Sequence, residues 1–234
     1  MQQATHTFSN GVSVYRHHLL ATQLERYAEE NVHEADEEQH FIDAVHSLPR
    51  GGVYVDVGAA IGYYVILASL LRPDLTVHAF EPLATHREQL AANLRLNGLG
   101  DAASIVVHPE AIAAHSGTRR FEDLSFGSRL APGGWRDWIK PSTRLLTDAT
   151  TLDLFAADKE LALVQIDIQG FETEALQGAR ESLSRKAIGI LIVGTHGSRV
   201  HNVCKDILLA HGYSITVDQP APRNQPDGVL VARV

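Results

Sequence analysis

Residues 53–62 read V-Y-V-D-V-G-A-A-I-G, a β-branched run that leads into an acid and then into small residues. The run predicts a buried strand over Val53–Val57. Gly58 permits a sharp turn and lets a ligand approach the backbone, and the two alanines after it keep that approach clear. Gly62 opens a helix predicted over Ile61–Leu71, whose N-terminus carries partial positive charge. The stretch therefore predicts a ligand site at the carboxyl end of a strand.

The next predicted strand, Leu75–Phe80, ends in H-A-F-E-P, so Glu81 lies at a neighbouring strand tip. An acid about 20 residues after a glycine turn is a typical partner of ribose hydroxyls, and Glu81 follows Gly62 by 19 positions. A tight turn with a capping carboxylate would need the same glycines, so the position of Glu81 is what favours a nucleoside. The G-x-x-x-G pattern lacks a pyrophosphate cradle, which argues against NAD or FAD and favours S-adenosylmethionine.

Outward from this turn, apolar strands alternate with amphipathic helices. Further strands are predicted over Ser104–Val107, Leu161–Ile168 and Ile188–Val193, and helices over Ala84–Asn97, Phe171 to about Ser184, and Val200–His211. This alternation predicts an α/β, Rossmann-like doubly wound sheet that is mostly parallel and covered on both faces. Two last strands, Ser214–Val217 and Val229–Val234, have no helix between them and predict a long-looped antiparallel hairpin.

The remaining segments divide the chain into two parts. Residues 1–49 predict an N-terminal helical cap, with helical periodicity from Tyr15 to Leu48, and residues 50–234 the main domain. Within the cap, the acidic run 29–40 is either a solvated helix face and joint or part of a lid. Residues 117–151 lack a simple pattern and are interpreted as an insertion beside the active face with one or two short strands.

Composition narrows the possible partners. The 234 residues carry a formal charge of −8 with scattered basic residues, so a nucleic-acid partner is not expected. Cys204 is the single cysteine, which excludes an internal disulfide. No stretch approaches the ~20 apolar residues that span a bilayer, and no signal peptide is evident. We expect a cytoplasmic protein that acts on a small molecule, and a homo-oligomer is possible.

Two strand ends carry candidate catalytic groups. Asp167 ends the fourth main strand, beside the strand that ends in Asp56, and either approaches the methyl donor and acceptor or caps the following helix. His196 follows the fifth strand, and a histidine there can remove a proton or merely hydrogen-bond a turn. His201 is a weaker candidate, and its spacing from His196 makes a zinc site improbable, so no metal ligands are assigned. A hard cation such as Mg²⁺ at Asp167 stays open.

Positions around these groups complete the candidate sets. Tyr63 packs either near the methionine moiety or in the core, and Asp101 either reaches the adenine or is an exposed loop acid. The candidate cofactor-binding residues are Asp56, Gly58, Ala60, Gly62, Tyr63, Glu81, Pro82, Asp101, Glu110, Ala111 and Asp167. The candidate substrate-binding residues are Ser128, Gln169, Glu172 and His201.

An ordered set of motifs resembles the FkbM-type S-adenosylmethionine-dependent methyltransferases. They are D-V-G-A-A-I-G-Y-Y, F-E-P, A-A-N-L-R-L-N-G-L, T-T-L-D-L-F and V-Q-I-D-I-Q-G-F-E-T-E-A-L-Q-G-A, within residues 50–212. The resemblance implies a class I methyltransferase fold of seven strands with the last antiparallel, O-methylation of natural products or sugars, and an adenine wall at Glu110 and Ala111. The family usually has D-V-E-G where this chain has Asp167 to Gly170, so Gln169 replaces a carboxylate. This exchange makes a hard cation at Asp167 less favourable.

These observations lead to one hypothesis and two alternatives. The hypothesis is an S-adenosylmethionine-dependent O-methyltransferase in which His196 is the general base. A nucleotide-dependent oxidoreductase would need the phosphate-binding glycines that are absent here. A non-catalytic cofactor-binding module is disfavoured by Asp167 and His196, although Gln169 leaves it open.

Overall fold

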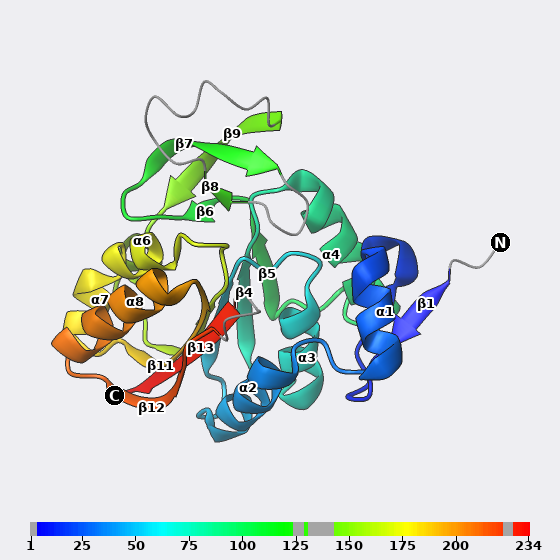
Figure 1. The fold of residues 1–234 in the computed structure, drawn as a ribbon, viewed down its shortest axis with the longest axis horizontal. Coiled ribbons are helices and arrows are strands. Elements are labelled where there is room, and N and C mark those ends of the chain that lie inside the picture. Colours follow the sequence, from blue (N-terminus) through cyan, green and yellow to red (C-terminus); the bar gives the residue numbers. More distant parts are fainter. Residues whose placement is uncertain (1–3, 124–128, 131–142, 222–226) are drawn as a thin grey trace.

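A seven-stranded sheet forms the centre of the protein, with strand order β12-β13-β11-β10-β3-β4-β5 (Figure 1). The computed structural model describes residues 4–123, 129–130, 143–221 and 227–234. The strands of this sheet are β3 (Val53–Val57), β4 (Thr76–Phe80), β5 (Ile105–His108), β10 (Leu161–Ile166), β11 (Ile188–His196), β12 (Ser214–Gln219) and β13 (Asp227–Arg233).

Strand directions in this sheet confirm the predicted doubly wound arrangement. Neighbouring strands from β5 through β4, β3 and β10 to β11 are parallel. Strand β13 lies between β11 and β12 and is antiparallel to both, so the predicted terminal hairpin is present. In the parallel register Asp56 lies opposite Gln165 of β10 and Ala79 of β4. The tips of β3, β4 and β10 therefore meet at one edge of the sheet.

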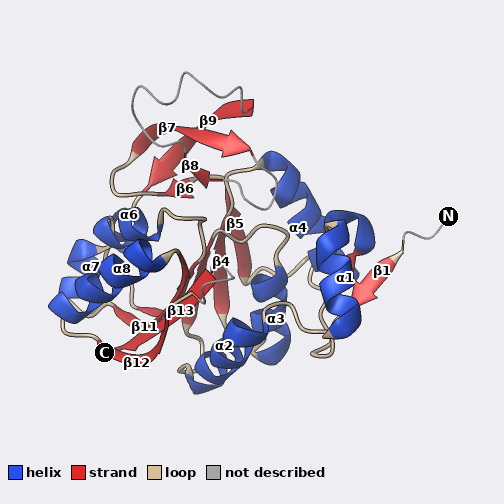
Figure 2. Ribbon diagram, in the orientation of Figure 1, coloured by secondary structure: helices blue, strands red, loops and turns tan. Residues whose placement is uncertain are grey.

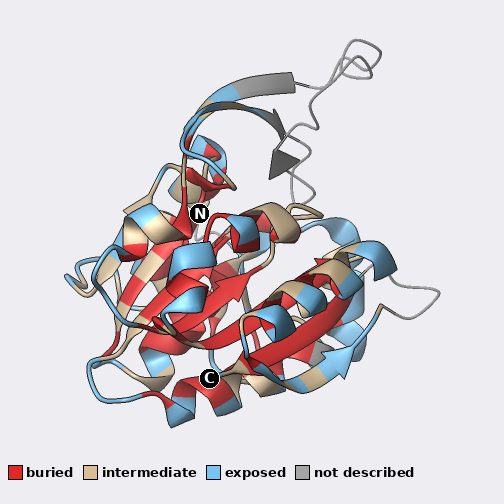
Figure 3. Ribbon diagram, turned by 90° about the vertical axis from the view of Figure 1, so that its left-hand side faces the viewer, coloured by how far each residue is buried: buried red, intermediate tan, exposed pale blue. Residues whose placement is uncertain are grey.

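Helices cover both faces of the sheet (Figure 2). Helices α2 (Ala35–Ser47), α3 (Tyr63–Leu71) and α4 (Ala84–Leu96) pack on one face, and α5 (Leu152–Ala156), α6 (Glu172–Gln177), α7 (Arg180–Ser184) and α8 (Ser198–Ala210) on the other. Successive strand residues point to opposite faces, so Tyr54 and Val55 enter different cores. Figure 3 shows the buried strands between helices whose outer surfaces are exposed. In the described part of the chain, no helix has the length and apolarity that a membrane span requires.

The N-terminal segment differs from the predicted all-helical cap. It begins with the hairpin β1 (Thr5–Thr7) and β2 (Ser13–Tyr15), continues through a 3₁₀ turn (Arg16–His18) and only then forms α1 (Ala21–Glu29) and α2. Strand β2 is held by the C-terminal end of helix α4. The side chains of Asn97, which follows the helix, and of Asn93 accept hydrogen bonds from the N–H groups of Ser13 and Tyr15 at 2.9 and 3.2 Å. Three-residue strands give no periodic signal, so tertiary contacts decided this hairpin.

Two further segments contain structure that the sequence pattern did not predict. A second sheet has the order β6-β9-β7-β8, from β6 (Ala111–Ile112), β7 (Gly117–Asp123), β8 (Arg129–Leu130) and β9 (Thr143–Thr150). Strands β7 and β9 are long and antiparallel, so residues 117–151 hold more β-structure than expected. The single helix predicted from Phe171 divides into α6 and α7 at Gly178, where a Cβ would lie 2.1 Å from the Ala113 carbonyl oxygen.

Candidate active site

The glycine turn after β3 is packed between two neighbouring strand tips. Gly58 has a φ of +94°, and a Cβ there would lie 2.1 Å from the Asp167 carbonyl oxygen. The N–H groups of Gly58 and the next residue both donate to the Phe80 carbonyl, at 2.9 and 3.1 Å. Gly62 has a φ of +87°, and a Cβ there would lie 2.8 Å from Leu90 Cγ. Both glycines are therefore required by backbone conformation and by close packing.

Glu81 follows β4 and lies directly beside this turn. Its side chain is buried, with Oε2 accepting from the Ala60 N–H at 2.9 Å and Oε1 accepting from the Leu83 N–H at 2.8 Å. Pro82 is partly buried, and its carbonyl accepts from Arg87 at 2.7 Å. The Glu81 carboxylate, predicted to bind a ribose, is thus hydrogen-bonded to the backbone of the turn. A bound nucleoside would compete with the Ala60 N–H for this carboxylate.

Candidates around β5 fall at two opposite edges of the sheet. Glu110 follows the carboxyl end of β5, and its Oε2 is buried without a hydrogen-bond partner among the described residues. Ala111 is buried and begins β6. Asp101, in contrast, is exposed in the loop between α4 and β5, where the parallel strands begin. This placement separates Asp101 from the turn and does not support its predicted part in cofactor binding.

Asp56 and Tyr63 lie on the inner side of the turn. Asp56 is 4% exposed, and burial together with the nearby Asp167 carboxylate raises its pKa to about 8. Tyr63 is the first residue of α3, and its hydroxyl donates to Glu38 at 2.5 Å and accepts from Asn10 at 2.7 Å. Its polar end therefore ties α3 to the N-terminal segment, which is closer to the core interpretation than to direct cofactor contact.

The tips of β10 and β11 bring Asp167, Glu172 and His196 together. Glu172 Oε1 lies 2.8 Å from His196 Nδ1, and Asp167 Oδ1 lies 3.6 Å from His196 Nε2. Glu172 is fully buried, and its Oε1 also accepts from the N–H groups of Gly170 and Ile168 at 2.9 and 3.3 Å. The imidazole is therefore held at Nδ1 by a carboxylate that is itself fixed by the backbone. This arrangement directs Nε2 towards Asp167.

Gln169 adopts a left-handed backbone conformation in the loop between β10 and α6. Its φ is +57°, and its Nε2 donates to Asp167 Oδ1 at 3.4 Å. The amide that replaces the family carboxylate thus contacts a candidate catalytic residue. Glu172, predicted to bind substrate, instead lies behind His196 and reaches the site through it.

A cavity of about 240 Å³ adjoins these side chains. One wall comes from the strand tips and includes Asp167, Gln169 and His196, and the other comes from α1, α2 and the segment between them. Sequence reasoning did not assign the residues of the second wall: Arg26, Glu30, Val32, His33, Glu34, Ala35 and Glu37. The available signal was the acidic run 29–40, several of whose residues line this wall.

One predicted substrate residue, His201, does not line this cavity. His201 is buried in α8, with Nδ1 2.8 Å from Thr195 Oγ1 and Nε2 2.9 Å from Asp218 Oδ1. These contacts join α8 to β11 and β12, so His201 has a structural position. Ser128 lies outside the described residues.

The Asp167, Glu172 and His196 side chains also form a possible metal-binding group, although no metal ligands were assigned from the sequence. One potential ligand atom from each lies within 4.8 Å of the others. The 2.8 Å contact between Glu172 and His196 has the geometry of a hydrogen bond, which suits an oriented imidazole as well as a ligand set.

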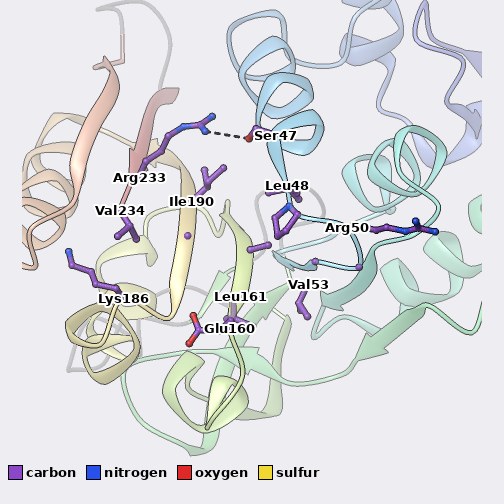
Figure 4. Close-up of a pocket in the computed structure, with 15 residues that line it drawn as sticks. Ser47, Leu48, Arg50, Val53, Glu160, Leu161, Lys186, Ile190, Arg233 and Val234 are labelled. Carbon is purple, nitrogen blue, oxygen red and sulfur yellow. Dashed lines mark hydrogen bonds between the residues drawn. The ribbon is translucent and has the colours of Figure 1, made fainter.

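A larger groove of about 610 Å³ lies at the opposite edge of the sheet (Figure 4). It is bordered by the start of β3, β10 and β11 and by the end of β13, with Arg233 donating to Ser47 at 3.3 Å. In open α/β sheets ligands bind at the carboxyl ends of the strands. The groove therefore lies away from Asp56, Glu81 and His196.

The strand order, the antiparallel β13 and the glycine turn with its neighbouring acid define a Rossmann-like methyltransferase fold. The model of the methyltransferase FkbM domain matches residues 56–215. The chain belongs to the FkbM methyltransferase family.

Two relatives illustrate how the sequence is related to known proteins. The 31-O-demethyl-FK506 methyltransferase FkbM of Streptomyces tacrolimicus is 32% identical over 130 residues, covering 54% of this chain and 47% of that protein. The AMB antimetabolite synthetase AmbE of Pseudomonas aeruginosa is 25% identical over 227 residues, covering 77% of this chain and 10% of that protein. The chain thus spans between a tenth and about half of the length of these relatives.

Solved structures support the fold. The methyltransferase FkbM of Methylobacillus flagellatus superposes with a TM-score of 0.57 at 19% identity, covering 79% of this chain and 44% of that one. The precorrin-6y C5,15-methyltransferase of Geobacter metallireducens gives a TM-score of 0.52 at 15% identity, covering 87% and 90%. At these sequence identities the similarity establishes only the fold. The methyl acceptor has to be inferred from the residues of the site.

Proposed function

We propose that this protein transfers a methyl group from S-adenosylmethionine to a hydroxyl of a small molecule, with His196 as the general base. Membership of the FkbM family supports the reaction class. The observation that carries the assignment of the base is the 2.8 Å contact between Glu172 and His196 beside the cavity. The acceptor class that we favour is a hydroxylated natural product or sugar.

The residues around the glycine turn fit the proposed cofactor. Glu81 offers a carboxylate for ribose hydroxyls, and the buried, unpartnered Oε2 of Glu110 offers an acceptor for the exocyclic amine of adenine. At Gly58 a Cβ would lie 2.1 Å from the Asp167 carbonyl oxygen, so the glycine lets the turn pack directly against the tip of β10. When bound, the sulfonium supplies a methyl group that is already activated for transfer.

The acceptor hydroxyl has to lose its proton when it is methylated, and this chain must supply the group that accepts that proton. With Nδ1–H donated to Glu172, His196 keeps its basic lone pair on Nε2, which faces Asp167. His196 lines the cavity, so Nε2 is the atom that would accept the proton of an acceptor hydroxyl. Asp167, at 3.6 Å from Nε2, would stabilise the imidazolium that results. The protein otherwise contributes orientation and exclusion of water.

The first test is calorimetric titration with S-adenosylhomocysteine and, in parallel, NAD⁺. We expect binding of the former only, and its loss on Glu81→Ala. Binding of NAD⁺ instead would contradict the proposal.

The second test measures formation of S-adenosylhomocysteine with a panel of hydroxylated metabolites. For an accepted substrate, His196→Asn should lower kcat by roughly 10²- to 10⁴-fold, the usual contribution of a general base. Affinity for S-adenosylhomocysteine should stay unchanged, because His196 acts on the acceptor. Unchanged turnover would remove His196 from the mechanism while leaving the cofactor assignment in place.

A further inference from the structure

Glu37 of helix α2 brings a buried carboxylate from the N-terminal segment to the strand tips. Its side chain is 5% exposed, and its Oε1 accepts from Gln165 Nε2 at 2.5 Å. Its Oε2 has no hydrogen-bond partner among the described residues and lies 3.4 Å from where a Cβ of Gly194 would be. Glu37 and Gly194 both line the cavity. The carboxylate of this buried side chain therefore lies at the wall of the cavity.

Several carboxylates act on the carboxyl group of Glu37. Burial and the neighbouring Glu34, Asp167 and Asp56 carboxylates raise the pKa of Glu37 well above its usual range. Buried acids that face one another are costly unless a cation lies between them. The electrostatics of the cavity thus suit a positively charged group near Glu37.

Acidic residues extend from the N-terminal segment to the part of the site that is proposed to bind the nucleoside. The Asp167, Glu81 and Glu34 carboxylates all raise the pKa of Asp56. The Gly58 turn touches the Asp167 backbone, so no other element separates the cavity wall from the turn. In S-adenosylmethionine the sulfonium lies between the ribose and the α-ammonium. Glu81, Asp56 and Glu37 would meet these three groups in the same order.

We propose that Glu37 binds the α-ammonium of the methionine end of S-adenosylmethionine, so that the N-terminal segment completes the cofactor site. This inference rests on the proposed function. Arg26 lines the same cavity wall and gives the α-carboxylate of that zwitterion a cationic partner.

Two ligands separate this role from a structural one. S-Adenosylhomocysteine carries the α-ammonium, whereas 5′-methylthioadenosine keeps the nucleoside and lacks the amino-acid end. Glu37→Gln should weaken binding of S-adenosylhomocysteine by roughly 10- to 100-fold, the value of a charge-assisted hydrogen bond, and leave that of 5′-methylthioadenosine unchanged. Gln keeps an acceptor for Gln165, so the fold should be preserved. The control, Glu29→Gln on exposed α1, removes the same charge and should change neither affinity.

The wild-type protein provides a measurement that does not depend on the variant folding. The analogue of S-adenosylhomocysteine that lacks the α-amino group should bind the wild type roughly 10- to 100-fold more weakly than the parent. Equal affinities for these two ligands, or equal losses of S-adenosylhomocysteine and 5′-methylthioadenosine in Glu37→Gln, would overturn the role of Glu37. Failure of the wild type to bind any of these nucleosides would overturn the proposed function itself.

Discussion

At the scale of single residues, Glu172 determines how His196 can act. A neutral imidazole has one donor and one acceptor nitrogen, and the bond to Glu172 assigns the donor to Nδ1. Glu172 is buried and receives backbone hydrogen bonds from Gly170 and Ile168, so it cannot turn away. In the proposed mechanism Glu172 is a positioning residue, because it acts through His196 and does not touch the acceptor.

This position leads to a prediction for Glu172→Gln. The amide oxygen can still accept from Nδ1–H, but the charge that stabilises an imidazolium is lost. We expect kcat to fall by roughly 10- to 100-fold, part of the full contribution of a general base, with KM unchanged. The acidic limb of the pH profile of kcat should also move to lower pH than in the wild type, because the imidazole of the variant holds its proton less tightly and is a free base at lower pH.

Steady-state kinetics over a pH series measure both effects. Unchanged affinity for S-adenosylhomocysteine serves as the control for folding. A rise in KM with constant kcat would instead indicate that Glu172 shapes the acceptor pocket.

At the scale of elements, the N-terminal segment is joined to the sheet by polar contacts. The Tyr63 hydroxyl of α3 connects Glu38 of α2 and Asn10 of the turn between β1 and β2. Asn10 also donates to Glu38 at 3.0 Å, which closes a small network. Burial and the bond to Glu38 raise the pKa of Tyr63, so the hydroxyl remains a donor at neutral pH.

Removing this hydroxyl should destabilise the protein. Tyr63→Phe leaves the buried Glu38 without its shortest hydrogen bond, which costs about 1–3 kcal/mol of unfolding free energy. Equilibrium unfolding in urea measures the change. Tyr15→Phe is the matched control, since no hydrogen bond of its hydroxyl is among those described, and it should stay within about 0.5 kcal/mol. Equal losses in both variants would show that the network contributes nothing specific.

At the scale of the whole molecule, the buried acids make stability depend on pH. Asp56 titrates near 3.8 when unfolded and at about 8 when folded, so between these values the folded state binds the proton more tightly. Stability is then greatest at acidic pH and falls as the pH rises through 8. Glu37 acts in the same direction. The partly buried His33 and His78, whose pKa values are lowered, affect stability in the opposite direction, and only below their ordinary pKa of 6.5.

We therefore expect the melting temperature of the unliganded protein to fall between about pH 7 and about pH 8.5, above the range of those histidines. Asp56→Asn should flatten this slope, because an amide does not titrate. Scanning calorimetry across this range is the measurement. A melting temperature that rises with pH would contradict the raised pKa of Asp56.

Much of the architecture could be predicted from local patterns. The β-branched runs at Val53–Val57 and Ile188–Val193 indicate strands that are buried on both faces. A glycine turn with an acid at the next strand tip indicates the edge of the sheet where a ligand binds. The hairpin β1–β2 could not be predicted, because Asn93 and Asn97 of a distant helix hold it. The division of α6 from α7 depends on the approach of the Ala113 carbonyl to Gly178.

The sequence by itself determined the order of strands and helices, the turn at Gly58 and the acids at strand tips, because periodicity and spacing are properties of neighbouring residues. Tertiary structure alone decided that Glu172 lies behind His196, that Glu37 of the N-terminal segment faces Asp167, and that Asp101 lies at the opposite edge. The reason is geometric. Each of these relations joins residues of different elements, and their distances are fixed only when the helices pack against the sheet.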